Sequence, residues 1–170
     1  MSKIFLVGMM GSGKTTCAKK WAGAVNAKAY DLDALIEEEE GCTISGIFAQ
    51  KSEDYFRKKE AELLRTFAQK DNFILATGGG LPCYYDNMQW MNEHGTTIWL
   101  NVSSGVLFSR LKHAREHRPL LSSLDDDALK EFINKKMAER EAFYSQAQHI
   151  FTDKEITKKH FKNFFDNDDK

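Results

Sequence analysis

The chain has 170 residues, with 24 Lys and Arg against 25 Asp and Glu and a formal net charge of −1. This length suits one domain with a sizeable core, and the charge balance excludes the broad basic surface of a general nucleic-acid-binding protein. A local basic pocket for a small anion remains compatible with it. No apolar run approaches the roughly 20 residues that span a bilayer, so we expect no membrane partner.

Short apolar runs alternate with longer amphipathic ones along the chain. Strands are predicted at residues 3–7, 27–30, 72–77, 96–100 and 149–152. Helices are predicted at residues 15–25, 33–40, 53–69, 85–93, 104–112, 126–146 and 155–165. This alternation predicts an α/β fold, a three-layer sandwich around a five-stranded parallel sheet that is wound in both directions. We expect a single domain over residues 1–170, with an acidic tail at 166–170 that frays.

The N-terminus and the cysteines indicate the cellular setting. The opening "MSKIFLVG" leads directly into a predicted strand and carries no signal peptide. Cys17, Cys42 and Cys83 are odd in number and show no CxxC spacing, which predicts neither a disulfide framework nor a zinc site. We therefore expect a cytoplasmic protein, and we expect a monomer because nothing in the sequence indicates an obligate interface.

The stretch "GMMGSGKT", residues 8–15, matches the phosphate-loop pattern G-x-x-x-x-G-K-[ST] without a mismatch. It lies between a predicted strand and a predicted helix, which is the context that the pattern requires. In such a loop the backbone N–H groups cradle phosphates, Lys14 reaches the β- and γ-phosphates, and the Thr15 hydroxyl ligates Mg²⁺. We expect ATP and Mg²⁺ as cofactors, held by Gly11, Ser12, Gly13, Lys14, Thr15 and Thr16.

The acidic pair of this site is predicted after the second strand, in "DLD". A GTPase would carry N-K-x-D, and no stretch of the chain matches it. Because the carboxyl ends of parallel strands face the ligand crevice, Asp31 and Asp33 are expected beside the phosphate loop. An Asp before "ALIEEEE" is also a good helix N-cap. Asp31 is therefore either a cap or a metal contact through water, and Asp33 is expected to point into the site.

A second glycine-rich stretch follows the third strand, in "FILATGGG". Three consecutive glycines cost chain entropy, so they indicate either a tight turn or a ligand that approaches the backbone closely. Downstream, "AREHRPLLSSLDDD" at residues 114–127 is an irregular connection between two predicted helices. In a compact domain such a segment is a surface loop or a mobile lid, and we favour the lid. Arg57 and Glu60, at spacing i, i+3, share a helix face, and taken alone they are a solvated surface pair.

Five ordered motifs together resemble the shikimate kinase family of P-loop, nucleoside-monophosphate-kinase-like proteins. They are "DLD", "IFAQKSEDYFRKKE", "TGGG", "RPLL" and "REAFY", and the resemblance runs from Ile4 to about Thr152. It implies a P-loop kinase fold with a mobile lid. It also implies the transfer of the γ-phosphate of ATP to a hydroxyl of shikimate, giving shikimate 3-phosphate in aromatic amino acid (chorismate) biosynthesis.

The resemblance also implies roles for particular residues. The acceptor would be shikimate, held by Asp33, Arg57, Glu60, Gly78, Gly79, Gly80 and Arg140. Within this set, the two arginines would bind the carboxylate, Glu60 would orient Arg57, and the Gly79 N–H would donate to the ligand. Asp33 would accept the proton of the attacking hydroxyl. Arg118 would close over the phosphates as a catalytic group, Arg110 would approach the nucleotide, and Phe48 and Phe56 would wall the acceptor pocket. No role is assigned to Arg115.

Two departures from the family pattern and three alternatives remain open. The family usually has Gly-Glu where this chain has Ser52-Glu53, and R-x-P-x-Y where it has "REAFY". Neither change removes a charged group that the mechanism needs, although the second bears on where Arg140 lies. The alternatives are a gluconate kinase, a nucleoside monophosphate kinase, and a non-catalytic ATP-binding module.

Overall fold

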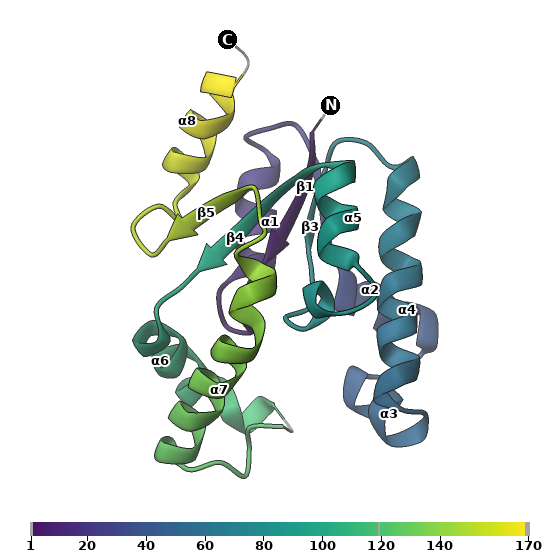
Figure 1. The fold of residues 1–170 in the computed structure, drawn as a ribbon, viewed down its shortest axis with the longest axis vertical. Helices are drawn as coiled ribbons and strands as arrows, with labels where there is room; N and C mark the ends of the chain where they lie inside the picture. Colours follow the sequence, from purple (N-terminus) through teal and green to yellow (C-terminus); the bar gives the residue numbers. More distant parts are fainter. Residues whose placement is uncertain (1, 119, 169–170) are drawn as a thin grey trace.

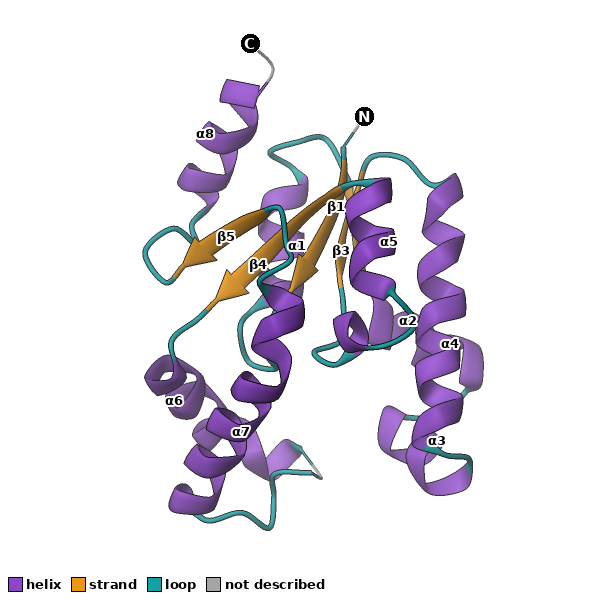
Figure 2. Ribbon diagram, in the orientation of Figure 1, coloured by secondary structure: helices purple, strands orange, loops and turns teal. Residues whose placement is uncertain are grey.

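The computed structural model describes residues 2–118 and 120–168 and contains one five-stranded parallel sheet (Figures 1 and 2). The strands, in chain order, are β1 (Lys3–Val7), β2 (Lys28–Asp31), β3 (Phe73–Ala76), β4 (Thr96–Asn101) and β5 (His149–Thr152). Their spatial order is β2-β3-β1-β4-β5. The predicted α/β sandwich with five parallel strands is confirmed, and each predicted strand lies within one residue of the observed bounds at either end.

The order of the strands decides which loops meet. β1 pairs in parallel with β3, and β3 pairs in parallel with β2. The phosphate loop follows β1, the "DLD" stretch spans the end of β2, and the three glycines follow β3. Because parallel strands end at the same edge of a sheet, the three stretches lie side by side, although up to about 70 residues separate them in sequence.

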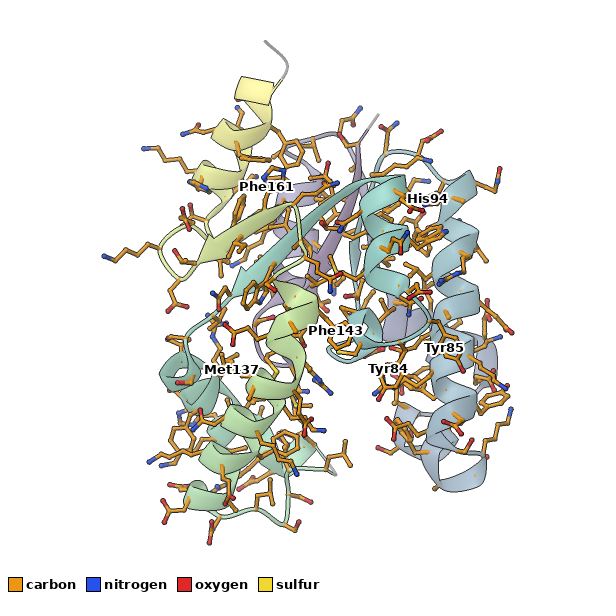
Figure 3. All side chains as sticks on the ribbon, in the orientation of Figure 1. Tyr84, Tyr85, His94, Met137, Phe143 and Phe161 are labelled. Atoms are coloured by element: carbon orange, nitrogen blue, oxygen red, sulfur yellow. The ribbon has the colours of Figure 1, made fainter. Side chains whose placement is uncertain are left out.

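The sheet is buried on both faces, as expected for parallel strands. Alternate residues of β1 point to opposite sides, so Ile4 and Leu6 pack on one face while Phe5 and Val7 pack on the other. The first face is covered by α1 (Lys14–Ala22) and α8 (Lys158–Asp168), where the rings of Trp21 and Phe161 stack with centroids 4.4 Å apart. Figure 3 labels Phe161 on α8.

The opposite face is covered by the larger set of helices. It includes α4 (Glu53–Thr66) and α5 (Asn87–His94), which lie in front of the sheet in Figure 1. The remaining helices are α2 (Leu32–Glu40), α3 (Ile44–Gln50), α6 (Ser104–Ala114) and α7 (Asp126–Tyr144), with short 3₁₀ turns η1 (Phe67–Gln69), η2 (Leu81–Cys83) and η3 (Arg115–His117). In the part of the chain described, no helix is long and apolar enough to cross a membrane.

Three helix predictions need correction. Residues 44–50 form α3, which we did not predict; it begins at the Thr43 cap, whose hydroxyl accepts the Gly46 N–H. The helix expected from residue 85 begins at Asn87, because Tyr85 and Asp86 are left-handed, with φ of 50° and 52°. The last helix begins three residues later than predicted.

The chain end and the expected lid are described in part. α8 continues to Asp168, into the segment 166–170 that was expected to fray, and residues 169 and 170 lie outside the described part. Within the expected lid at 114–127, residue 119 also lies outside the described part. Its two ends are tied together, since the Arg115 guanidinium donates to Asp126 Oδ1 at 2.7 Å and to the Leu124 carbonyl at 3.3 Å. The mobility of this segment stays a prediction.

Candidate active site

The loops at the ends of β1, β2 and β3 line a cleft of about 840 Å³. The predicted site residues that line it are Gly11, Ser12, Gly13, Lys14, Thr15, Thr16, Asp31, Asp33, Gly78, Gly79, Arg110 and Arg118. Among the described residues, four other predicted ones stand outside this lining, namely Arg57, Glu60, Gly80 and Arg140. Gly80 belongs to the glycine stretch, and the side chains of Arg57, Glu60 and Arg140 lie close to that stretch.

The phosphate loop has a backbone that only glycine adopts easily. Gly11 and Gly13 have φ of 80° and 89°, in the left-handed region. Gly13 is the N-cap of α1, so the unpaired N–H groups of the first helical turn face the cleft together with the positive end of the helix dipole. The Lys14 ammonium donates to the carbonyls of Gly8 and Met9 at 2.7 and 2.9 Å. The Lys14 side chain thus reaches back across the phosphate loop to its first two residues.

Burial perturbs Lys14. The pKa of Lys14 is lowered to about 8, chiefly because burial removes its ammonium from water; Asp33 opposes the shift and the nearby Arg140 adds to it. A lysine with this pKa is still largely protonated at neutral pH. It is therefore a cation that is poorly compensated by its surroundings, which favours an anion in front of it.

Asp31 caps α2, and its contact with a metal stays a prediction. Its Oδ1 accepts the Ala34 N–H at 3.1 Å, which caps α2, and its Oδ2 accepts a short hydrogen bond from the Thr15 hydroxyl. This pair of hard oxygen atoms fits Mg²⁺, which binds one or two protein ligands together with phosphates and water. No group of three or more His, Cys, Asp or Glu within the described ranges is placed to hold a metal. A cation here would therefore depend on the nucleotide for its remaining ligands.

Two carboxylates near the glycine stretch, those of Asp33 and Glu60, each have one buried oxygen without a hydrogen-bond partner among the described residues. These atoms are Asp33 Oδ1 and Glu60 Oε2. Burial raises the pKa of Asp33, with a further contribution from Asp31. Burial likewise raises the pKa of Glu60, to about 7, although Arg57 opposes the shift. Unpaired buried oxygens are costly, so both atoms are candidates for contacts with a ligand.

The three glycines make room for four charged side chains. A Cβ atom at Gly78 would lie 2.7 Å from Glu60 Oε2 and 3.0 Å from Asp33 Oδ1. A Cβ at Gly79 would lie 3.1 Å from Arg140 Nη1. A Cβ at Gly80 would lie 2.7 Å from Arg57 Nη2. None of the three glycines has a left-handed φ, so space and not backbone conformation requires glycine here. A tight turn alone therefore does not explain the stretch.

The two arginines reach these glycines from distant helices. Arg57 on α4 is paired with Glu60 at 2.8 Å, and their side chains are only 11% and 1% exposed, so the alternative of a solvated surface pair is wrong. Arg140 lies near the end of α7, which is fixed to the glycine stretch by the Tyr144 hydroxyl donating to the Gly79 carbonyl. Two guanidinium groups therefore lie against adjacent residues of one loop.

Comparison with known proteins decides the family. A family model of shikimate kinases matches residues 10–167. The chain is 44% identical to shikimate kinase of Bacteroides thetaiotaomicron over 92% of its length and 89% of the relative, and 42% identical to that of Phocaeicola vulgatus over 94% and 91%. The chain belongs to the shikimate kinase family.

Solved structures of shikimate kinases have the same fold. The crystal structure of the Bacteroides thetaiotaomicron enzyme superposes with a TM-score of 0.91 at 39% identity, covering 99% of both chains. The shikimate kinase of Acinetobacter baumannii, solved in complex with shikimate, has a TM-score of 0.82 at 25% identity, covering 98% of this chain and 90% of that one. ATP is thus the phosphoryl donor of this family member.

The remaining predicted residues flank the shikimate kinase cleft. The Arg110 guanidinium donates to the Gly11 carbonyl at 3.0 Å and so contacts the phosphate loop directly. Arg118 is exposed and lines the cleft at the described edge of the lid. Phe48 and Phe56 pack on each other, with ring centroids 5.0 Å apart, and Phe56 is buried in the core. Its ring also lies 5.3 Å from the Arg57 guanidinium carbon.

Sequence reasoning missed one end of the cleft. Cys17, Lys20 and Trp21 on α1 line it together with the segment between β5 and α8, residues 156–158. Because α1 starts at the phosphate loop, this end lies beyond the phosphates. The sequence offers one weak signal for it: "EITK" lies two residues after the last strand of a sheet whose strand ends face the ligand.

Lys14 gives the first prediction, because its pKa of about 8 lies within reach of a titration. The protonated ammonium binds phosphates, so ATP affinity should fall as the pH rises through this value. We expect the ATP dissociation constant, measured by calorimetry with Mg²⁺ and no acceptor, to increase about tenfold from pH 7 to pH 9. The control is Lys14→Arg, which keeps its charge at pH 9 and should show no such increase. An equal pH response of both proteins would contradict the assignment.

Proposed function

We propose that this chain transfers the γ-phosphate of ATP to a hydroxyl of shikimate, giving shikimate 3-phosphate and ADP, as a step of aromatic amino acid (chorismate) biosynthesis. The observation that carries the proposal is the approach of Arg57 and Arg140 to adjacent glycines beside the phosphate loop. Two guanidinium groups suit an anionic acceptor, because arginine binds carboxylates through paired, charge-assisted hydrogen bonds. Membership of the family and the shikimate bound to a structural neighbour support the same acceptor.

The donor side binds the nucleotide. Gly11, Gly13 and Thr16 would surround the phosphates with N–H groups, and the buried Ser12 hydroxyl, which has no partner among the described residues, would bind a phosphate oxygen. Thr15 and Asp31 would hold Mg²⁺, which supplies charge neutralisation at the phosphates when it is bound. Arg110 would fix the loop from outside, and residues 156–158 would accommodate the base.

The acceptor side orients a small ring. Arg57 and Arg140 would bind the shikimate carboxylate, with the Gly79 N–H as a further donor. Glu60 holds one edge of the Arg57 guanidinium. Gly78 leaves Asp33 close enough to contact the ring hydroxyls.

The reaction then follows from the positions of the charged groups. Asp33 accepts the proton of the attacking shikimate hydroxyl while the oxygen of that hydroxyl bonds to the γ-phosphorus. The bond from the γ-phosphorus to the β,γ-bridging oxygen breaks at the same step and releases ADP. The pKa of Asp33 is raised by burial, which suits a proton acceptor. Lys14 and Arg118 stabilise the charge on the transferred group. Closure of the lid at 114–127 excludes water, which would otherwise compete as acceptor.

The proposal extends to the organisation of the protein. Residues 1–170 form a single P-loop kinase domain that acts as a monomer in the cytoplasm. Neither a nucleic acid nor a membrane is a partner. The balanced net charge of −1 supports this, since attraction of the acceptor depends on two local arginines and not on a basic surface.

The choice of acceptor is the second prediction. In a coupled ADP-release assay at saturating MgATP, shikimate should stimulate turnover, whereas gluconate and AMP should leave the basal rate unchanged. Stimulation by AMP or gluconate and not by shikimate would favour an alternative kinase. ATP binding without stimulation by any acceptor would favour the non-catalytic module.

The same assay tests the role of Asp33. Asp33→Asn should reduce shikimate-dependent turnover about a hundredfold or more, the usual size of a lost general base, while ATP affinity changes little.

Gly80 gives the third prediction, since an added Cβ would meet the Arg57 guanidinium at 2.7 Å. The end of a long side chain can move aside, so Gly80→Ala should remain folded while Arg57 is displaced. We expect the KM for shikimate to rise about tenfold or more, in line with the loss of one charge-assisted contact.

The matched control for Gly80 is Gly105→Ala. Gly105 lies in α6, where a Cβ would meet nothing within 4 Å, and the change should leave the KM for shikimate unaltered. If Gly80→Ala bound shikimate as well as the unmodified protein, Arg57 would not be an acceptor ligand.

A further inference from the structure

The Arg57 guanidinium has several neighbours besides its ion-pair partner Glu60. One edge of the guanidinium meets Glu60 at 2.8 Å and another meets Glu53 at 3.3 Å. The Gly80 backbone approaches it closely, as described above. Two aromatic rings also lie near it: the Tyr84 ring centroid is 4.5 Å from the guanidinium carbon, and the Phe56 ring centroid is 5.3 Å from it. A cation at this distance over an aromatic face is attracted by the ring quadrupole.

The Tyr84 ring lies on a segment that is fixed at both ends. Its N–H donates to the Leu81 carbonyl at 3.3 Å, and its carbonyl accepts the Asn87 N–H at 2.9 Å. The hydroxyl donates to Glu53 Oε1 at 3.3 Å, the same oxygen that Arg57 contacts. Figure 3 shows Tyr84 and its neighbour Tyr85 on the connection between η2 and α5, beside α4.

The neighbouring residue explains why this exposed segment keeps its shape. Tyr85 has a left-handed backbone, and its carbonyl accepts the Arg65 guanidinium at 2.8 Å. The same guanidinium contacts Asn87, at the start of α5. Tyr84 is 38% exposed and Tyr85 48%, so hydrogen bonds to the backbone, and not burial in the core, fix this segment. Tyr84 contacts the acceptor side through Arg57 and Glu53.

We propose that Tyr84 is a positioning residue for the acceptor: its ring stacks on the Arg57 guanidinium and holds it in the orientation that binds the carboxylate. The proposal rests on the proposed function, in which Arg57 binds shikimate. Glu53 is 57% exposed in its side chain, so water screens its pairing with Arg57 and the pair alone orients the guanidinium weakly. The ring covers a face of the guanidinium that neither carboxylate can hold.

Three variants distinguish the contribution of the Tyr84 ring to acceptor binding from those of its hydroxyl and of the surrounding loop. Tyr84→Leu removes the aromatic face but keeps a side chain of similar bulk, whereas Tyr84→Phe keeps the face and loses only the hydroxyl. Tyr85→Asn is the matched control, because it removes the adjacent exposed ring and Asn tolerates the left-handed backbone well. Circular dichroism and thermal unfolding establish that each variant is folded.

The kinetic experiment measures KM and kcat with shikimate and with ATP. Tyr84→Leu should raise the KM for shikimate about fivefold, as expected for the loss of one partly desolvated cation–π contact, with kcat and the KM for ATP within about twofold of the unmodified protein. Tyr84→Phe and Tyr85→Asn should keep the KM for shikimate within about twofold. An unchanged KM in Tyr84→Leu, or an equal rise in Tyr84→Phe or Tyr85→Asn, would overturn the proposal.

A second readout needs no acceptor and so separates this proposal from the proposed function. The Nε–Hε resonance of Arg57, assigned by its absence in Arg57→Met, should carry a ring-current shift from Tyr84. We expect the shift to be lost in Tyr84→Leu and kept in Tyr84→Phe and Tyr85→Asn. If Tyr84→Leu kept the shift, the stacking would be wrong. If Tyr84→Leu lost the shift but the unmodified protein did not turn over shikimate, the stacking would stand and only the proposed function would be contradicted.

Discussion

The site depends on the close approach of one backbone loop to four ionisable side chains. Asp33, Glu60, Arg140 and Arg57 occupy the space that side chains at residues 78–80 would fill. Arg57 and Glu60 form an ion pair within this cluster, yet Asp33 and Glu60 each keep one oxygen without a partner among the described residues. The arginines suit the carboxylate of a small ligand, and the unpaired carboxylate oxygens suit its hydroxyl groups.

The sheet brings this cluster to the phosphates. Because β3 lies between β1 and β2, the glycine stretch emerges between the phosphate loop and the acidic pair. Asp33 therefore lies near both halves of the site: it is close to Gly78, and it is among the groups that perturb the pKa of Lys14. The two helices that supply the arginines, α4 and α7, lie on opposite sides of the end of β3 in Figure 1. An acceptor bound between them would lie against the end of the phosphate chain.

Much of this arrangement could be predicted from the sequence, because strong local patterns carried it. The phosphate loop, the alternation of strands and helices, and the Asp31 cap each depend on neighbouring residues and were predicted correctly. α3 was missed because its seven residues show too little periodicity, and the start of α5 was misplaced because the Arg65 contacts hold Tyr85 in a left-handed conformation. The residues at the far end of the cleft, Trp21 and the 156–158 segment, are brought together only by the packing of α8 on α1.

A crystal structure of the protein with shikimate and ADP would test the central claim most directly. The account predicts that the shikimate carboxylate lies within about 2.7–2.9 Å of guanidinium nitrogens of both Arg57 and Arg140, with the Gly79 N–H directed at the ligand and one ring hydroxyl beside Asp33. A carboxylate bound elsewhere, or contacted by neither arginine, would contradict it.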